Sequence, residues 1–466
     1  MGNPFTSDRL AVIIIGADMT GSAVFQDLVR FLAHMVEIHV VDGGTVKEAD
    51  LARQHFTSKD VGKNKARVLQ ARATGALGLD RVFAHPYDLT DVRQLHDLAQ
   101  FYASVILIGT VDNRLARSVQ EQFVRETKVA TYYLCLTDGE YAGGVMALCR
   151  TDEGEADSVG SPMDPSHLTD VAGEPVRGGL VPTAGKLPAW ISSRMAAIIS
   201  LELVAKALKG NLQTGLAHFH QCRISRVTPA LTQLVAGRIA VILVGAGGIG
   251  SAVFQDLVRY LSPMIEIHLV DGDLVEGRNL QRQHFTRKDL RRNKASALHE
   301  KARDLLKREG VQAHAFYLTE PEQLHQIARN YSAVILIGGV DNHPARKVQE
   351  QFVRETKVPT YYLCLANGEN SGEVFATYQV DGAQYGFFRS HIDPSVLTDE
   401  EGDPTRRSCG QQLDAGSIQT LVANRKAAII ALELVFQALV GTIQTGIVYF
   451  DECTTAQVAV VTPAAA

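Results

Sequence analysis

The pattern of apolar and polar positions in the second half of the chain alternates between buried strands and helices. Residues 239–244 form a continuous apolar run, which is typical of a strand buried on both faces of a parallel sheet. A glycine-rich turn follows, and residues 251–261 show helical periodicity. The alternation predicts an α/β fold with a Rossmann-like, doubly wound, mainly parallel sheet. Further strands are predicted at 265–270, 333–337, 360–365, 374–380 and 446–450, and further helices at 293–307, 345–356 and 425–439.

The first half of the chain repeats the second at a constant offset. The run GSAVFQDLVR at 21–30 returns at 250–259, an offset of 250 − 21 = 229 residues, and each copy closes with Val-Thr-Pro. Each copy has the length of a complete domain, which places the boundary near Ala230 and predicts domains over 1–230 and 231–466. No Gly/Ser- or Pro-rich linker separates the copies. Direct packing into a pseudo-dimer is therefore favoured over two independent domains that do not contact each other.

Composition and charge narrow the classes of function. The formal net charge is −5, which argues against broad electrostatic binding to nucleic acid or to an anionic membrane. The N-terminal residues give no export signal, and no apolar segment is long enough to span a bilayer. The six cysteines form no C-x-x-C pair, which argues against a structural zinc site and fits a reducing compartment. The chain is therefore predicted to be cytoplasmic.

A glycine loop in the second copy has the features of a phosphate-binding turn. Gly245, Gly247, Gly248 and Gly250 lie between a predicted strand and a predicted helix, where backbone N–H groups and the helix N-terminus favour a phosphate. Asp271 ends the next strand, 271 − 250 = 21 residues later, where a carboxylate can bind a ribose hydroxyl. Glycines also allow tight strand-to-helix packing, which is the structural alternative. The loop and the aspartate together favour nucleotide binding.

Further polar residues follow Asp271 in a recognisable order. The segment 271–285 reads DGDLVEGRNLQRQHF, and it is followed by Lys294 and by Val-Asp-Asn at 340–342. This combination resembles the signature of ubiquitin-activating and ThiF/MoeB-type adenylating enzymes, and the resemblance covers nearly all of each copy. Within that family the chain is most similar to bacterial ThiF-like proteins of the plasmid PRTRC type and of bacterial ubiquitin-like conjugation operons.

The resemblance implies an enzyme that uses ATP and Mg²⁺ to adenylate the C-terminal carboxylate of a small ubiquitin-like or sulfur-carrier protein with a glycine tail. A conjugating enzyme is a further implied partner. Taken singly, each polar residue has a plain alternative as a surface lysine, loop asparagine or turn aspartate, so the assignment depends on their co-occurrence. The implied roles are phosphate contacts for Arg282 and Lys294, nearby hydrogen bonds for Asn279 and Gln283, ribose binding for Asp271, magnesium binding for Asp341 and assistance at the metal for Asp273.

The first copy is altered where this chemistry would take place. Gly247 and Gly248 are replaced by Asp18 and Met19. A carboxylate repels a phosphate, and a side chain with a Cβ blocks close approach of the backbone. The first copy is therefore predicted to be a non-catalytic partner. Gly44 also replaces Asp273 and Asp50 replaces Asn279, whereas Arg53, Gln54, Lys65 and Asp112 are retained.

An inactive copy joined to an active one resembles the eukaryotic ubiquitin-activating enzymes. In those enzymes the inactive half contributes an arginine to the ATP phosphates, from a helix that precedes the first strand. Only Met1–Leu10 precedes the first strand here, and Arg9 is the sole candidate in that segment. The sequence thus leaves the trans arginine unassigned.

Cys409 is the candidate for a thioester with the activated carboxylate. It follows Arg406 and Arg407, whose charges favour a thiolate, and it precedes an apolar helix at about the position where ThiF/MoeB relatives carry a cysteine. A cysteine that merely lines the crossover loop is an equal alternative, because zinc-binding cysteine pairs and a large inserted cysteine domain are absent. Cys135 and Cys364 repeat at a strand end and are predicted to pack in the core.

Three other classes of function remain open on the sequence. An NAD-linked oxidoreductase would use the glycine loop and Asp271, but it leaves Arg282, Lys294 and Asp341 without a role. Adenylating enzymes that act on peptides or tRNA bases are closer alternatives, although the acidic net charge makes a nucleic-acid partner less attractive. The third class is a scaffold that binds nucleotide and partner without turnover.

Overall fold

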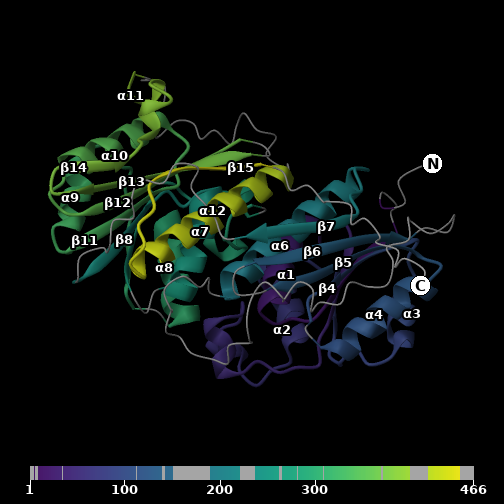
Figure 1. Cartoon of the computed structure of the whole chain (residues 1–466). Helices are drawn as coiled ribbons and strands as arrows, with labels where there is room; N and C mark the ends of the chain where they lie inside the picture. Colours follow the sequence, from purple (N-terminus) through teal and green to yellow (C-terminus); the bar gives the residue numbers. More distant parts are fainter. Residues whose placement is uncertain are drawn as a thin grey trace, which may run out of the picture.

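Two mixed, mostly parallel sheets form the framework of the chain, one in each half (Figure 1). The α/β fold predicted from the sequence is confirmed. The predicted boundary near Ala230 and the Cys409 region lie outside the described residues. The computed structural model describes residues 5, 9–33, 35–111, 113–138, 142–150, 189–220, 237–261, 265–280, 282–307, 309–368, 371–398 and 418–451.

The first sheet has the strand order β3-β2-β1-β4-β5-β6-β7. Strands β1 to β5 are parallel, and β6 and β7 are added as antiparallel strands. The strands are β1 (Leu10–Ile15), β2 (Glu37–Val41), β3 (Val82–His85), β4 (Ser104–Gly109), β5 (Ala130–Asp138), β6 (Ala142–Arg150) and β7 (Gly215–His220). The α-helices are α1 (Met19–Leu32), α2 (Lys65–Arg72), α3 (Val92–Ala99), α4 (Arg114–Glu126) and α6 (Ala189–Leu208).

The second sheet repeats this arrangement in the order β10-β9-β8-β11-β12-β13-β14, with β15 also paired to β13. Most predicted elements are present, and β10, β14, α9 and α11 are additions that the sequence pattern did not indicate. The strands are β8 (Ile239–Val244), β9 (Glu266–Val270), β10 (Val311–His314), β11 (Ala333–Gly338), β12 (Thr360–Asn367), β13 (Gly372–Val380), β14 (Ala383–Gly386) and β15 (Gly446–Phe450). The α-helices are α7 (Gly248–Asp256), α8 (Lys294–Leu306), α9 (Pro321–Ala328), α10 (His343–Glu355), α11 (Ser395–Thr398) and α12 (Ile418–Leu439).

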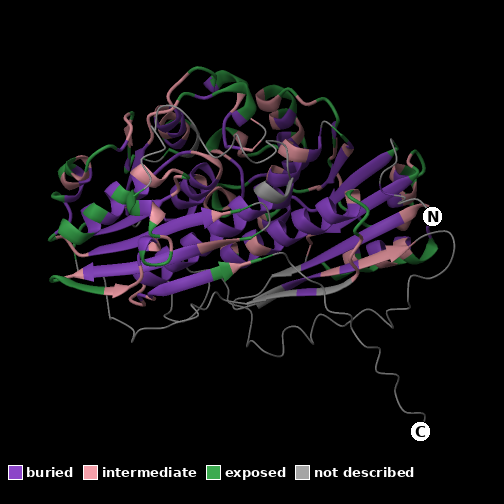
Figure 2. Ribbon diagram, turned by 90° about the horizontal axis from the view of Figure 1, so that it is seen from above, coloured by how far each residue is buried: buried purple, intermediate pink, exposed green. Residues whose placement is uncertain are grey.

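The central parallel strands are buried on both faces because helices cover each side of the sheet. Successive side chains of a strand point to opposite faces, so Val12 and Ile13 in β1 belong to two different apolar cores. Val241 in β8 belongs to the same core as Val12, whereas Ile242 belongs to a core of the second half alone. Figure 2 shows the strands of both sheets as largely buried. One apolar core therefore runs through both halves.

The two halves pack directly against each other, as the lack of a linker predicts. Helices α6 and α12 meet between the sheets, beside α1 and α7 (Figure 1). Arg194 on α6 bridges Asp27 on α1 (Nη1–Oδ2 3.3 Å) and Asp256 on α7 (Nε–Oδ2 3.2 Å), and Arg425 on α12 lies 3.0 Å from Asp27. All four side chains are almost fully buried. This buried cluster between the halves therefore brings two positive and two negative charges together.

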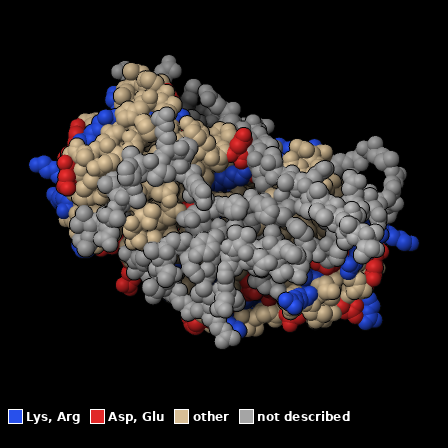
Figure 3. All heavy atoms as spheres, in the orientation of Figure 1, with Lys and Arg blue, Asp and Glu red and all other residues tan. Residues whose placement is uncertain are grey.

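The described surface carries charges of both signs. On the face drawn in Figure 3, Lys/Arg and Asp/Glu side chains alternate around the rim, in keeping with the small net charge. Among the helices that the structure describes, none is both long enough and apolar enough to span a bilayer.

Candidate functional site

A cavity of about 590 Å³ opens at the carboxyl ends of β8, β9 and β11. The strands that follow β8 in the chain are added first on one side of it (β9, β10) and then on the other (β11, β12). Open α/β sheets bind ligands in the crevice at such a switch point. Gly250 does not line the cavity, and Cys409 lies outside the described residues. The cavity brings together these predicted site residues: Gly245, Gly247, Gly248, Asp271, Asp273, Asn279, Arg282, Gln283, Lys294 and Asp341.

The glycines of the loop differ in why a side chain is absent, as Gly245, Gly250 and Gly247 show. Gly245 has φ +96°, a left-handed conformation that favours glycine, and a Cβ at Gly250 would lie only 1.8 Å from the Gly245 carbonyl oxygen. These two glycines are needed for the fold, and both are retained in the first copy. A Cβ at Gly247 would meet no atom within 4 Å. Gly247 therefore leaves open space in the cavity wall.

Asp271 ties the glycine loop to the end of the neighbouring strand. Its Oδ2 accepts a hydrogen bond from the Ala246 amide at 2.6 Å, and its Oδ1 accepts one from the Asp273 amide at 2.8 Å. Burial raises the pKa of this carboxyl group. In the first copy, Asp42 holds Ala17 in the same way at 2.6 Å. Asp271 therefore has a structural role that does not depend on a bound ribose.

Lys294 presents a buried cation to the cavity. Its Nζ pairs with Asp273 Oδ2 at 2.8 Å, and Tyr317 donates a hydrogen bond to Asp273 Oδ1 at 3.0 Å. The preceding residue, Asn293, caps α8 and donates hydrogen bonds from Nδ2 to the carbonyl oxygens of Asp271 (2.8 Å) and Asp273 (3.1 Å). The helix start and the 271–273 turn are thus fixed together. A phosphate at this site would compete with Asp273 for Lys294.

The segment that follows contributes polar atoms with unfilled hydrogen-bonding capacity. Among the described residues, Arg282 Nε and the buried Gln283 Oε1 have no hydrogen-bond partner. Burial lowers the pKa of Arg282, with an opposing effect from Asp341. Asn279 is partly engaged already, because its Oδ1 accepts a hydrogen bond from the Glu276 amide at 2.8 Å. Arg282 and Gln283 can therefore accommodate a polar ligand without losing existing bonds at these atoms.

The carboxylates at the cavity fit a magnesium ion that arrives with a nucleotide. Within the described ranges, no group of three or more His, Cys, Asp or Glu side chains is placed to hold a metal ion. Magnesium is ordinarily held by one or two carboxylates together with substrate phosphates and water. Asp341 and Asp273 both line the cavity and supply such oxygen ligands.

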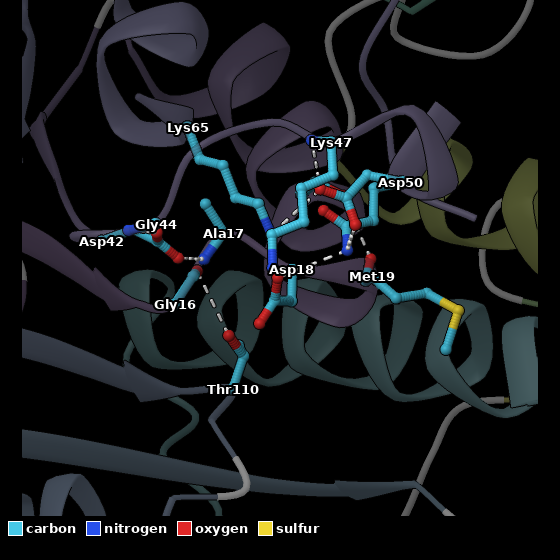
Figure 4. Close-up of polar contacts among 12 residues, drawn as sticks. Gly16, Ala17, Asp18, Met19, Asp42, Gly44, Lys47, Asp50, Lys65 and Thr110 are labelled. Atoms are coloured by element: carbon cyan, nitrogen blue, oxygen red, sulfur yellow. Dashed lines mark hydrogen bonds and ion pairs between the residues drawn. The ribbon is translucent and has the colours of Figure 1, made fainter. Parts of the chain in front are cut away.

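The corresponding site of the first half contains its own anion (Figure 4). Asp18 stands at the position of Gly247, and its Oδ1 pairs with Lys65 Nζ. Lys65 also lies 3.6 Å from Asp50 Oδ2, and Gln54 Nε2 donates hydrogen bonds to Asp18 at 3.3 Å and to Asp50 at 3.0 Å. Lys65 is therefore neutralised by carboxylates of its own half. That this half binds no nucleotide stays a prediction.

The candidate trans arginine, Arg9, is not among the residues that line the cavity. It precedes β1, at the opposite end of that strand from the glycine loop, and its Nη2 donates a hydrogen bond to the Phe101 carbonyl at 2.5 Å. Tyr317 and Asn293 were not anticipated as site residues. Tyr317 follows β10, which the sequence pattern missed, whereas Asn293 directly precedes Lys294 and could have been recognised as a helix cap. Other unanticipated lining residues include His343, Arg346, Asn367, Arg389 and Asn424.

Comparison with known proteins assigns the chain to a family. The model of the ThiF family matches residues 7–166 and 219–448, which together make up more than half of the chain. The chain belongs to the ThiF family. No curated protein matches it significantly.

Solved structures that match part of the chain include PaaA (19% identity, TM-score 0.32) and E. coli MccB, solved alone (16% identity, TM-score 0.34) and with AMPCPP and MccA (18% identity, TM-score 0.33). The matches cover 45% of this chain for PaaA and for the MccB complex, and 46% for MccB alone. In each case the match spans 60% of the other chain's length.

Proposed function

We propose that this chain uses ATP and magnesium to adenylate the C-terminal carboxylate of a small ubiquitin-like or sulfur-carrier protein, as its likeness to bacterial ThiF-like proteins implies. The observation that carries the proposal is the convergence of the glycine loop with Arg282, Lys294 and Asp341 on one cavity, in a chain of the ThiF family. An NAD-linked oxidoreductase gives no role to this combination of two cations and a carboxylate.

The proposed reaction is a displacement at phosphorus. An oxygen of the carrier's C-terminal carboxylate attacks the α-phosphorus of ATP and forms a new P–O bond. The bond from the α-phosphorus to the α,β-bridging oxygen breaks, and pyrophosphate leaves with that electron pair. The product is an acyl adenylate. Charge on the phosphate oxygens is the main obstacle to this step, so fixed cations at the site provide most of the catalysis.

The site residues divide this work. Lys294 and Arg282 contact the phosphates, and Gln283 bonds nearby. Gly247 allows close approach of the helix α7 N-terminus, which favours negative charge. Asp341, assisted by Asp273, would hold a magnesium ion, which neutralises phosphate charge when bound.

The test is ATP–pyrophosphate exchange with candidate carrier proteins that end in a glycine tail. Lys294→Ala should lower the exchange rate by at least roughly a hundredfold, because a cation that stabilises the transition state is lost. Lys65→Ala is the matched control in the first copy and should leave the rate within about twofold, because Lys65 pairs with Asp18.

Asp341→Ala should also abolish exchange. Full exchange activity in Lys294→Ala or Asp341→Ala would contradict the assignment, and so would an equal loss in Lys65→Ala. ATP–pyrophosphate exchange with peptides, and not with any glycine-tailed protein, would show that the chain adenylates a peptide. Binding of NAD without binding of ATP would favour the oxidoreductase.

Transfer to Cys409 is a further step of the proposal, supported by the sequence alone. The Cys409 thiolate would attack the acyl carbon, AMP would leave, and the thioester would pass the carrier to a conjugating enzyme. Cys409→Ser should retain pyrophosphate exchange and lose a thiol-sensitive adduct with the carrier. An adduct that persists in this variant would exclude Cys409 as the acceptor.

A further inference from the structure

The segment 280–285, which carries Arg282 and Gln283 into the cavity, is held by a residue of the other half. Arg30, near the end of α1, directs Nη1 to three backbone carbonyl oxygens of this segment. These belong to Leu280 (3.3 Å), Gln283 (3.0 Å) and Phe285 (3.1 Å). The three carbonyl groups lie within six positions of the chain, so their convergence on one guanidinium ties Leu280 to Gln283 and Phe285.

A second side chain of α1 contacts the same segment one turn earlier. Gln26 Nε2 lies 3.1 Å from His284 Nδ1 and donates a hydrogen bond to Gln255 Oε1 at 2.7 Å. From its own half, the segment receives a hydrogen bond from Lys301 Nζ to the His284 carbonyl at 2.8 Å. The backbone of 280–285 is thus clamped between α1 of the first half and α8 of the second.

We propose that Arg30 is a positioning residue for the nucleotide site of the second half, acting in trans through the backbone of 280–285. The proposal rests on the function proposed above. All three contacts come from one nitrogen, Nη1, so a single cationic group binds the carbonyl oxygens of Leu280, Gln283 and Phe285. Burial lowers the pKa of Arg30 to about 10, so the group remains charged at neutral pH. Its loss would leave carbonyl groups without their partner and would let Arg282 and Gln283 shift relative to a phosphate.

The pseudo-symmetry of the chain provides a matched control. Arg259 on the second half contacts the carbonyl oxygens of Leu51 (3.1 Å), Gln54 and Phe56 (3.2 Å), which are the first-half counterparts of the Arg30 partners. Its clamped segment belongs to the site in which Asp18 already pairs with Lys65. Loss of either arginine removes an equivalent set of interface contacts. Only the loss of Arg30 disturbs the segment that carries Arg282.

The experiment compares Arg30→Gln with Arg259→Gln in the full chain. Hydrogen–deuterium exchange without nucleotide should accelerate at 279–285 in Arg30→Gln and at 50–56 in Arg259→Gln. The Kd for ATP with magnesium, measured calorimetrically, should rise roughly tenfold to a hundredfold in Arg30→Gln and less than about threefold in Arg259→Gln. Arg30→Lys should restore part of the affinity, because it returns a cation to the carbonyl oxygens.

Unchanged amide exchange at 279–285 in Arg30→Gln would overturn the clamp. Faster amide exchange in Arg30→Gln with an unchanged ATP affinity would show that Arg30 does not position the nucleotide site. Equal losses of ATP affinity in Arg30→Gln and Arg259→Gln would reduce both arginines to general interface residues. Absence of ATP binding by the unmodified chain would instead overturn the proposed function, and the trans role with it.

Discussion

At the scale of single residues, positions 18 and 247 differ in side chain but not in backbone. Asp18 has φ −72° and ψ −154°, and Gly247 has φ −74° and ψ −149°, so an L side chain is sterically acceptable at both. Gly247 is therefore not required by local conformation. What it provides is empty space in front of Lys294, which in the first half is taken by the Asp18 carboxylate next to Lys65.

Gly247→Asp should convert the second site into a copy of the first. The new carboxylate should pair with Lys294 and repel phosphate, so the Kd for ATP should rise by at least roughly a hundredfold while the fold is kept. Calorimetric titration with ATP and a urea unfolding curve would measure the two effects. Gly247→Ala is the control, because its methyl group enters open space and should weaken binding far less. Equal losses in the two variants would show that steric blocking, and not charge, is responsible.

At the scale of elements, the strongly patterned segments were predictable and the short edge segments were not. Strand β8 has the predicted bounds because six consecutive apolar residues leave little choice for a buried parallel strand. Strand β10 reads VQAH and is only partly buried, so no apolar run or clear alternation marks it. Its edge position is fixed by pairing with β9, which is a long-range contact that local pattern does not contain.

Both halves contain the same hydrogen-bonded chain at this sheet edge. In the first half, Tyr102 donates its hydroxyl proton to Glu37 and must therefore accept from His39 Nε2 at 2.7 Å. His39 Nδ1 is then an acceptor for His85 Nε2 at 2.9 Å, which requires a neutral His39. Burial, and next the charge of His85, lower the pKa of His39 to about 4. His268 of the second half also has a pKa of about 4 from the same causes.

Acidification should therefore destabilise the fold at pH values higher than those at which carboxyl groups titrate. These histidines are neutral in the folded state and have a pKa of about 6.5 when unfolded, so their contribution is present above pH 6.5 and is lost as the pH falls toward 4. From pH 7.5 to 5.5 the free energy of unfolding should fall by about 1.4 kcal/mol for each such histidine. Urea unfolding at both pH values measures it.

The control for this pH dependence is the double variant His39→Gln with His268→Gln, which should have a shallower decline. Glutamine can donate to the tyrosine and accept from the second histidine without titrating. The decline should not vanish, because buried His55 and His284 also have pKa values well below the ordinary range, mainly from burial. A free energy of unfolding that is constant or higher at pH 5.5 would contradict the assignment.

At the scale of the whole molecule, the buried charges between the halves should make them unfold together. Arg194→Met removes the guanidinium that bridges Asp27 and Asp256, and it leaves Asp256 buried without that partner. The expected loss is about 3–5 kcal/mol in the free energy of unfolding. Trp190, the single tryptophan, stacks on Tyr260 of the other half at 4.3 Å, so its fluorescence reports on the interface.

Tryptophan fluorescence and far-ultraviolet circular dichroism should therefore give coincident transitions during denaturation. Arg93→Met, at an exposed ion pair with Asp91, should leave the midpoint unchanged. An early fluorescence transition, with helix content retained, would show instead that the halves separate before they unfold.

Within one copy, the glycine loop and the main charged side chains of the candidate site were predictable from the sequence, whereas lining residues such as Tyr317 and Asn424 were not. Lys294, Arg282 and the glycine loop form a linear signature, and the carboxyl ends of parallel strands meet at one edge of the sheet. The contribution of the other half was not predictable. Arg30 recognises backbone carbonyl groups about 250 positions away, and carbonyl groups carry no sequence signature. The sequence offered Arg9 as its sole candidate and left the trans arginine unassigned, and the structure places Arg9 against Phe101.

The identical helix run at 21–30 and 250–259 has a consequence for how the two copies can diverge. It contains the residues that each half offers to the other, namely Gln26, Asp27 and Arg30 with their counterparts. A substitution in this run of either copy therefore changes contacts in the other copy as well as in its own. A substitution confined to one ligand site leaves the other site unchanged, whereas a substitution in this helix alters contacts in both halves. Because the two copies are joined in one chain, a substitution can fall on one site alone, whereas in a homodimer every substitution would fall on both sites at once.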